Sequence, residues 1–204
     1  MKTFGNVAAA AVVAASLVLG TGASFAQNNN GTLTEPMDLE IGHEHTQILL
    51  EWNHVGVTTT RAVIHDFQGT VHVDPQTPAN SHVSVTMDMN SFDSFFAPRD
   101  NVLKSARFFN VEAYPQVTFE STEIVSTGDK TAEMHGNMTI LGQSHPVVFD
   151  VTFNKAAENM GAFVAGFDAV AKIDRGEVGL KDIYPNVAPE ITVKISAELV
   201  KPKQ

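Results

Sequence analysis

The chain has 204 residues, no cysteine and a formal net charge of −10. Without cysteine, the protein can form neither disulfides nor thiolate metal sites, and thiolate catalysis is excluded with them. The acidic balance argues against nucleic acid and anionic lipid surfaces as main partners, because both carry charge of the same sign as the protein.

Residues 1–26 have the pattern of a secretory signal peptide. Lys2 is the only charged residue, an apolar run follows from Val7 to Gly20, and Ser24 and Ala26 place small side chains at the two cleavage-determining positions. The run of about 14 apolar residues is shorter than the roughly 20 that span a bilayer, which disfavours a retained membrane anchor. We therefore expect cleavage near Ala26 and export of a mature chain without a membrane span.

The mature chain would start at Gln27 and comprise about 178 residues, which suits one domain with a sizeable core. Loss of Lys2 from the 13 basic residues leaves 12 against 23 acidic residues, a formal charge of −11. Residues 27–37 are polar and rich in Gly and Asn, so we expect a flexible leader there. The folded domain is expected over residues 38–200.

Alternation of apolar and polar residues predicts strands over the first half of this domain. The alternating segments are residues 46–53, 61–67, 71–74 and 82–89. A turn or bulge is expected at residues 54–57, and a second turn at residues 66–69 should close the second strand. The inward-facing residues would be Ile48, Leu50, Trp52, Val71, Val73, Val83, Val85, Met87 and Met89.

A short helix is predicted near residues 98–107, where the alternation stops. Val102, Leu103 and Ala106 recur at helical spacing, and Pro98 stands before the first turn. Acidic Asp100 comes early and basic Lys104 comes late, which suits the helix dipole.

Strands resume after this insertion at residues 117–119, 134–140, 147–153, 163–173 and 191–199. The clearest hairpin lies within residues 139–153, where Gly142 makes the turn and Val147, Phe149, Val151 and Phe153 share one apolar face. The long segment 163–173 has an inward face of Phe163, Ala165, Phe167, Ala169, Ala171 and Ile173.

About eight strands joined by short connections should pair antiparallel, and their shared apolar face must be covered. Closure into an eight-stranded antiparallel β-barrel achieves this and removes both sheet edges. A two-sheet sandwich is the alternative, because alternation alone does not distinguish the two closures. An eight-stranded barrel can be filled by its own side chains or can hold one slender ligand.

The predicted interior leaves open whether the barrel is packed or hollow. Three inward alanines on segment 163–173 could leave a lumen, and Met87, Met89, Met134 and Met138 would make its wall adaptable. A fully packed core fits the same pattern.

His43 and His45 are weak metal candidates, because they would share one face of a strand and could bind zinc or copper. Two ligands make a weak site, however, and the other histidines are spread over several segments, with His72 and His82 predicted to face outward. We expect no metal site. If these histidines did bind a metal, the chain would be a metal- or stress-related periplasmic binding protein, and we keep this function as an alternative.

No catalytic motif is found in the sequence, which lacks a Gly-x-Ser-x-Gly elbow, a His-Glu-x-x-His pair and a glycine-rich phosphate loop. Asp93, Asp100, Asp174 and Arg175 could be charged site residues, but Asp and Arg in loops more often form structural ion pairs or turn hydrogen bonds. We expect neither catalysis nor a cofactor.

Five ordered sequence blocks stand out: His45-Thr46 with His54-Val55-Gly56-Val57-Thr58-Thr59, Arg99-Asp100-x-x-Leu103, Phe108-Phe109-x-Val111-x-x-Tyr114-Pro115-x-Val117-x-Phe119, Met138-Thr139-Ile140-x-Gly142, and Ile173-Asp174-Arg175-x-x-x-Gly179-Leu180. Together they resemble the signature of YceI-like proteins, and the resemblance covers the chain from about Asp38 to Leu199.

The resemblance implies an extended lipocalin-like barrel in the periplasm that binds a polyisoprenoid or isoprenoid-quinone-type lipid in a central tunnel, and it allows a homodimer. The tunnel would be lined or supported by Trp52, Phe119, Phe149, Val151, Phe167, Ile191 and Val193. Arg99, Asp100, Asp174 and Arg175 would lie at its mouth or brace the helical insertion, and the bracing role is favoured.

Two positions depart from the family pattern. Val102 stands where the family often has histidine, and Gly176 stands at a serine-like position. If the family's histidine orients a polar head group, Val102 implies a different head group here, or one that is held less firmly.

Overall fold

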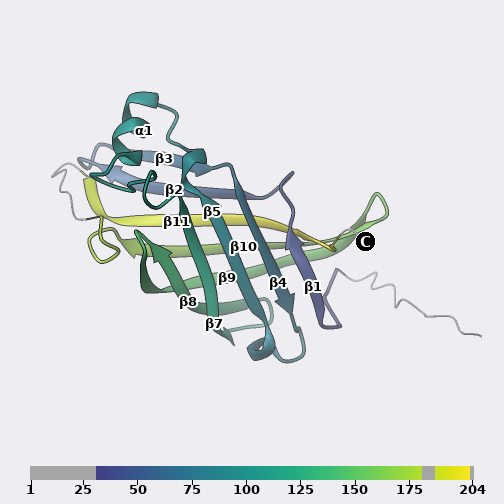
Figure 1. Cartoon of the computed structure of the whole chain (residues 1–204). Helices are drawn as coiled ribbons and strands as arrows, with labels where there is room; N and C mark the ends of the chain where they lie inside the picture. Colours follow the sequence, from purple (N-terminus) through teal and green to yellow (C-terminus); the bar gives the residue numbers. More distant parts are fainter. Residues whose placement is uncertain (1–30, 181–186, 203–204) are drawn as a thin grey trace, which may run out of the picture.

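A computed structural model describes residues 31–180 and 187–202, which form an antiparallel β-barrel with one α-helix (Figure 1). The strands are β1 (Met37–Ile41), β2 (Gln47–His54), β3 (Thr58–Ile64), β4 (Phe67–Val73), β5 (His82–Asp88), β6 (Phe92–Asp93), β7 (Gln116–Ser126), β8 (Thr131–Ile140), β9 (Gln143–Asn159), β10 (Ala162–Asp174) and β11 (Val187–Val200). The helices are α1 (Ala97–Lys104) and two 3-10 turns, η1 (Pro78–Asn80) and η2 (Met89–Ser91).

The sheet closes on itself through eight strands. Its hydrogen-bonded order is β1-β4-β5-β7-β8-β9-β10-β11, and β11 pairs back with β1. The remaining strands β2, β3 and β6 continue β1, β4 and β5, respectively, along the barrel. This arrangement follows from the pairing of β2 with β11 and β3, and of β3 with β6. Closure confirms the predicted eight-stranded barrel and rules out the sandwich.

The first three barrel strands are each broken once, between β1 and β2, β3 and β4, and β5 and β6. The breaks lie side by side, since Ile48 pairs with Ile64 on one side of them and Glu40 pairs with Thr70 on the other. Strand β11 bridges the first break, where Glu198 accepts a hydrogen bond from Gly42 (2.8 Å). Three strands therefore bend at one level of the barrel.

Two sequence predictions fail at these breaks. The predicted turn at residues 66–69 is wrong, because Phe67 begins β4, pairs with Met87 and is buried. His43 and His45 do not share a strand face, because residues 43–45 form a turn between β1 and β2. At Phe67, pairing with a distant strand overrides the local turn signal.

The predicted helical insertion is confirmed but is shorter than expected. Helix α1 ends at Lys104, and the Ser105 backbone N–H donates to the Val102 carbonyl at 3.2 Å. Ala106 therefore lies outside the helix, in a series of turns that leads to β7. Figure 1 shows α1 at one end of the barrel, where it contacts the short strand β6.

The hairpin at residues 139–153 has the predicted geometry. Leu141 and Gly142 both have positive φ (50° and 73°), as a tight two-residue hairpin turn requires. On β10, Ala165, Ala169 and Ala171 all face inward and are buried, as the alternation predicts.

Part of the expected leader lies against the barrel. The Ala156 backbone N–H donates to the Gly31 carbonyl (3.0 Å), and the Gln76 side chain donates to the Thr34 carbonyl (2.9 Å). Leu33 packs on a core cluster that includes Leu39 and Leu199. Gly31, Leu33 and Thr34 therefore contact the folded domain, and the predicted signal peptide lies outside the described residues.

Candidate binding cavity

Two adjoining apolar cavities occupy the barrel interior. The first has a volume of about 520 Å³ and lies at the α1 end, and the second has a volume of about 370 Å³ and extends toward the β7–β8 turn. Met87, Met138 and Val193 line both. Each volume lies within the range of small-molecule sites, roughly 300–1,000 Å³. The interior is therefore hollow, not fully packed.

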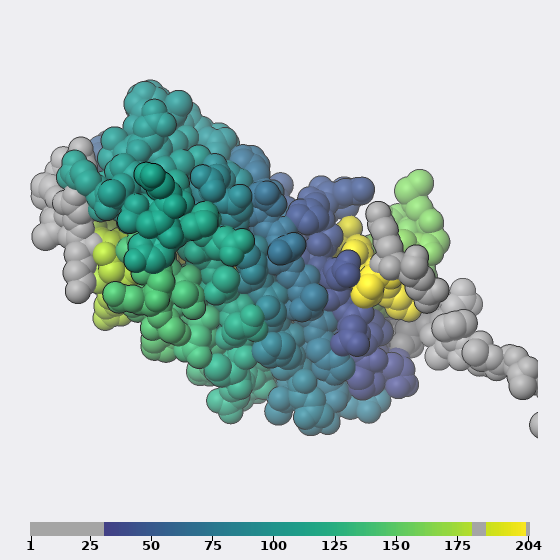
Figure 2. Space-filling model, viewed as in Figure 1, coloured from purple at the N-terminus to yellow at the C-terminus, as the bar shows by residue number. Residues whose placement is uncertain are grey.

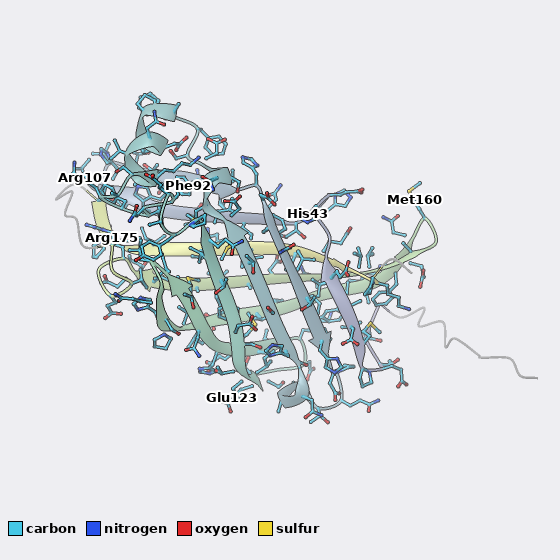
Figure 3. The ribbon with its side chains drawn as sticks, viewed as in Figure 1. His43, Phe92, Arg107, Glu123, Met160 and Arg175 are labelled. Atoms are coloured by element: carbon cyan, nitrogen blue, oxygen red, sulfur yellow. The ribbon has the colours of Figure 1, made fainter. Side chains whose placement is uncertain are left out.

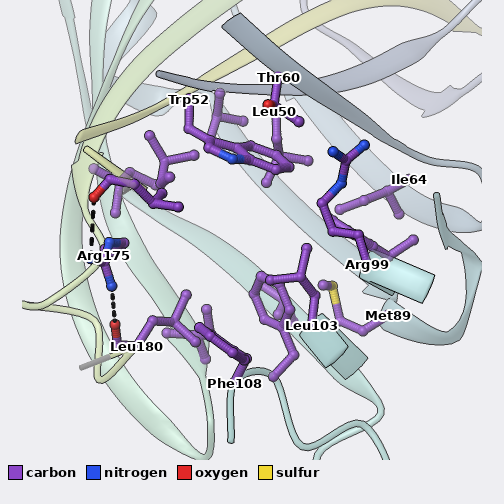
Figure 4. Close-up of a pocket in the computed structure, with 18 of the residues that line it drawn as sticks. Leu50, Trp52, Thr60, Ile64, Met89, Arg99, Leu103, Phe108, Arg175 and Leu180 are labelled. Carbon is purple, nitrogen blue, oxygen red and sulfur yellow. Dashed lines mark hydrogen bonds between the residues drawn. The ribbon is translucent and has the colours of Figure 1, made fainter. Parts of the chain in front are cut away.

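The first cavity is built from both regular and irregular segments (Figure 4). Strand β2 contributes Leu50 and Trp52, and β3 contributes Ile64. The opposite wall comes from the helical insertion, including Leu103 and Phe108. The insertion therefore forms part of the wall and does not simply decorate the barrel.

All seven residues predicted to line the tunnel lie on cavity walls. Trp52 and Ile191 line the first cavity, Val193 lines both, and Phe119, Phe149, Val151 and Phe167 line the second. Phe119 and Phe149 pack edge to face with ring centroids 5.2 Å apart. That these side chains contact a ligand stays a prediction.

The sequence reasoning missed the wall residues of the insertion. Phe92, Leu103, Phe108 and Phe109 all line the first cavity. Phe92 is 2 % exposed, and its ring packs against Phe109 at 5.6 Å. No strand alternation covers this segment, although its density of phenylalanine was a signal that could have been used.

Polar side chains are few in the first cavity and belong to the segments around its open end. They are His54, Thr58, Thr60, Arg99 and Arg175. The end of β2, the start of β3, helix α1 and the turn after β10 supply them. An apolar chamber with a polar edge suits a ligand that has a long apolar part and a small polar part.

Arg99 and Asp100 brace the start of the helical insertion by gripping Ser94, which is 1 % exposed. Arg99 Nε donates to Ser94 Oγ at 2.8 Å, and Asp100 Oδ1 accepts from the Ser94 backbone N–H at 2.9 Å. Further hydrogen bonds join Arg99 Nη2 to the Ser94 carbonyl and Ser94 Oγ to Asp100. Arg99 also lines the first cavity.

Asp174 and Arg175 organise the turn after β10. Asp174 Oδ1 accepts from the Gly176 backbone N–H at 2.7 Å. Arg175 donates to the carbonyls of Leu180 (3.1 Å), Val187 (3.3 Å) and Ala188 (3.3 Å), so it ties the end of β10 to the start of β11 (Figure 4). Both residues have a bracing role, and Arg175 lines the cavity as well.

Asp93 holds the loop before α1 in place electrostatically. Its carboxylate accepts a hydrogen bond from the Phe95 backbone N–H at 2.7 Å, and His65 lies 3.4 Å away. The Phe95 N–H, followed by His65, lowers the pKa of Asp93, so this carboxylate stays ionised near neutral pH.

Within residues 31–180 and 187–202, no group of three or more His, Asp or Glu side chains could hold a metal ion. His43 is exposed and stacks on Phe67 with ring centroids 5.0 Å apart. His72 and His82 face outward, as predicted, and pair with Asp38 (2.7 Å) and Glu120 (3.3 Å). The same described ranges contain no helix long and apolar enough to cross a membrane.

The closed antiparallel barrel with an apolar interior has the lipocalin-like architecture. The chain belongs to the YceI family: the model of the YceI-like domain matches residues 39–199. A UPF0312 protein of Pseudomonas putida F1 is 34 % identical over 170 residues, which cover 81 % of this chain and 88 % of the relative. Protein YceI of Salmonella arizonae is 32 % identical over 161 residues, which cover 78 % and 84 %.

Solved structures share the same fold. BcnA of Burkholderia cenocepacia superimposes with a TM-score of 0.70 at 23 % identity, over 79 % of this chain and 99 % of BcnA. A polyisoprenoid binding domain from Saccharophagus degradans superimposes with a TM-score of 0.61 at 7 % identity, over 80 % of this chain and 98 % of that domain. At these identities, the likeness establishes the fold alone.

Proposed function

We propose that this protein binds a long-chain polyisoprenoid or isoprenoid-quinone-type lipid inside the barrel and acts in the periplasm as a carrier or store of that lipid. One observation carries the proposal: two apolar cavities adjoin along the barrel, and the polar residues of the first belong to segments around its open end. The structural neighbour described as a polyisoprenoid binding domain supports the same ligand class.

The length of the interior suits a slender chain better than a compact ligand. On β11, Ile191 lines the first cavity and Leu199 lines the second. Eight residues of strand span roughly 27 Å. At the tilt usual for such barrels, this corresponds to about 20 Å along the barrel axis. The lipid chain would run from one cavity into the other past Met87 and Met138, whose flexible side chains can adapt to it.

Burial of the chain would supply most of the binding free energy. Each CH₂-sized group gains about 0.8 kcal/mol on leaving water, so four isoprene units, about 20 carbons, would gain roughly 16 kcal/mol before association and ordering costs. The head group would lie at the α1 end, near Arg99, His54 and Thr58. Val102 lines this end as well, so an apolar side chain replaces the family's frequent histidine beside the head group.

The proposed role is binding, without catalysis and without a cofactor other than the lipid itself. Native mass spectrometry of protein purified from its own periplasm, combined with organic extraction, tests this role. We expect a co-purifying prenyl lipid. Fully unliganded protein that also rejects added prenyl lipids would contradict the proposal. The same spectra would report whether the protein is a homodimer, as the family resemblance implies.

A further inference from the structure

Five exposed apolar residues lie on, or next to, segments that line the first cavity at its α1 end, and we refer to them as the rim. They are Val55 (51 % exposed), Val57 (82 %), Phe95 (67 %), Phe96 (57 %) and Val102 (38 %). Phe96 and Val102 line the cavity themselves, and Val55 and Val57 lie between its lining residues His54 and Thr58. The apolar surface of the interior therefore continues outward onto the rim.

Two rim residues are held in a backbone conformation that their side chains disfavour. Phe95 has φ 64° and Val55 has φ 51°, in the left-handed region that asparagine and glycine occupy more readily. Such residues cost on the order of 1–3 kcal/mol each and persist where the surrounding structure enforces them. Solvent exposure of a large apolar side chain adds nothing to folding that would offset this cost.

The structure around Phe95 enforces its conformation. The Asp93 carboxylate accepts from the Phe95 backbone N–H (2.7 Å), and the buried Ser94 is fixed by Arg99 and Asp100. With Asp93 and Ser94 held in this way, Phe95 and Phe96 project into solvent. Figure 2 shows the insertion as a knob at one end of the molecule.

The two segments that carry the rim differ in charge from the chain as a whole. Residues 53–59 contain no Asp, Glu, Lys or Arg, and residues 92–114 contain three basic and three acidic residues, so these segments have no net formal charge. The chain as a whole carries −10. Repulsion from an anionic surface therefore acts on the remainder of the barrel and turns the rim toward that surface. The overall charge disfavours anionic lipid as a general partner, but the neutral rim is an exception.

We propose that the rim docks into the interface of a phospholipid bilayer, so that the cavity mouth opens directly into lipid. This inference rests on the proposed function, since a bound prenyl chain would pass between membrane and cavity without crossing water. A bilayer fits the rim better than a second copy of the chain does, because Phe96 and Val102 belong both to the exposed rim and to the cavity lining, and a rigid partner seated on them would cover the cavity. Exposed Phe and Val side chains on a neutral surface suit shallow interfacial insertion.

The test uses asparagine at the two strained positions, because asparagine tolerates positive φ and removes the apolar surface. In Val55→Asn, the new residue precedes Gly56, which gives the Asn-Gly pair that tight hairpin turns favour. The matched control is Met160→Asn, since Met160 is fully exposed, has φ 51° and precedes Gly161. Met160 lies at the opposite end of the molecule (Figure 3).

Flotation of the exported protein with vesicles of phosphatidylethanolamine and phosphatidylglycerol is the assay. We expect wild type and Met160→Asn to float with the vesicles, and the double variant Val55→Asn/Phe95→Asn to bind them on the order of tenfold more weakly. Its melting temperature should equal or exceed that of wild type. We also expect uptake of a prenyl lipid from detergent micelles to be unchanged in the double variant and its uptake from vesicles to be slower.

Vesicle binding by the double variant at the wild-type level would overturn the inference, as would equal loss in the Met160→Asn control or no vesicle binding by wild type. A wild-type dimer that the double variant dissociates, with no vesicle binding, would assign the rim to a second copy and overturn it too. Vesicle binding by a wild-type protein that takes up no prenyl lipid from micelles would contradict the proposed function and leave the docking inference standing.

Discussion

Replacement of Ala169 by phenylalanine should shorten the space available to a bound chain. Ala169 is 8 % exposed, lines the second cavity and pairs with Val151 and Ile195 on the neighbouring strands. Because Ala169 lines the second cavity, a ring at this position would extend into that cavity. We therefore expect Ala169→Phe to destabilise the unliganded protein by less than the roughly 1–3 kcal/mol that over-packing a filled core costs.

The effect on binding should depend on ligand length. If the ring excludes four CH₂-sized groups of a long prenyl chain, the loss is about 3 kcal/mol, or roughly a hundredfold in Kd. A short prenyl lipid that fits within the first cavity should bind Ala169→Phe as it binds wild type. Titration can follow the fluorescence of Trp52, the only tryptophan, which lies on the wall of the first cavity.

Val170→Phe is the matched control, because Val170 is the next residue and is exposed on the outer face of β10. It should leave both affinities unchanged. Equal weakening of short and long lipids by Ala169→Phe, or unaltered binding of the long lipid, would refute a chain that extends into the second cavity.

Three further substitutions test the walls and their braces. Phe149→Ala should lower the free energy of unfolding, measured by urea titration, by about 3–5 kcal/mol, because the Phe149 side chain is only 2 % exposed. An unchanged urea midpoint would show that the cavity wall does not depend on this side chain. In Arg175→Lys, the lysine cannot donate to the same three carbonyls in the same geometry, so we expect a loss of about 1–3 kcal/mol in stability and weaker lipid binding. A melting curve identical to that of wild type would contradict the bracing role of Arg175. Hydrogen bonds from Lys194, and to a smaller extent from Arg61, lower the pKa of Glu51 below its ordinary value of 4.5. The ionised Glu51 side chain therefore stabilises the folded protein above pH 4.5, and this stabilisation is lost as the pH falls through the lower pKa of the folded state. Glu51→Gln should therefore be less stable than wild type at pH 7, by up to about 1 kcal/mol, and the free energies of unfolding of the two proteins should converge in acid. The control is Glu190→Gln, which removes an exposed ion pair with Lys172 and should have a smaller effect on stability at pH 7.

The inward-facing residues could be predicted best for long strands that pair with neighbouring strands over most of their length. On β10 and β11, alternation identified the inward residues, including Ala169 and Val193, because a period of two has only two phases and one was clearly apolar. The break before Phe67 could not be predicted in this way. Asp66 and Gly69 suggest a turn locally, and only the distant pairing of Phe67 with Met87 makes this segment a strand.

The helical insertion shows the opposite limit. Five of the 13 phenylalanines lie between residues 92 and 109, yet neither helical nor strand periodicity orders them. Some are buried on the cavity wall, such as Phe92, and others are exposed on the rim, such as Phe95. Turns and side-chain hydrogen bonds to Ser94 set these directions, and such contacts leave no periodic trace in a sequence.

The aligned breaks in the first three strands give the barrel two mechanically different halves. Strands β7 to β11 run from one chamber to the other with only local bulges, whereas β1/β2, β3/β4 and β5/β6 change direction at the level between the chambers. Ligands of different girth should therefore be accommodated by bending of the segmented half against a stiffer one. Amide hydrogens at the breaks, in residues 42–46, 65–66 and 89–91, should exchange faster than those of β9 and β10. Ligand binding should slow hydrogen exchange at these breaks more than at the other amides of the barrel wall.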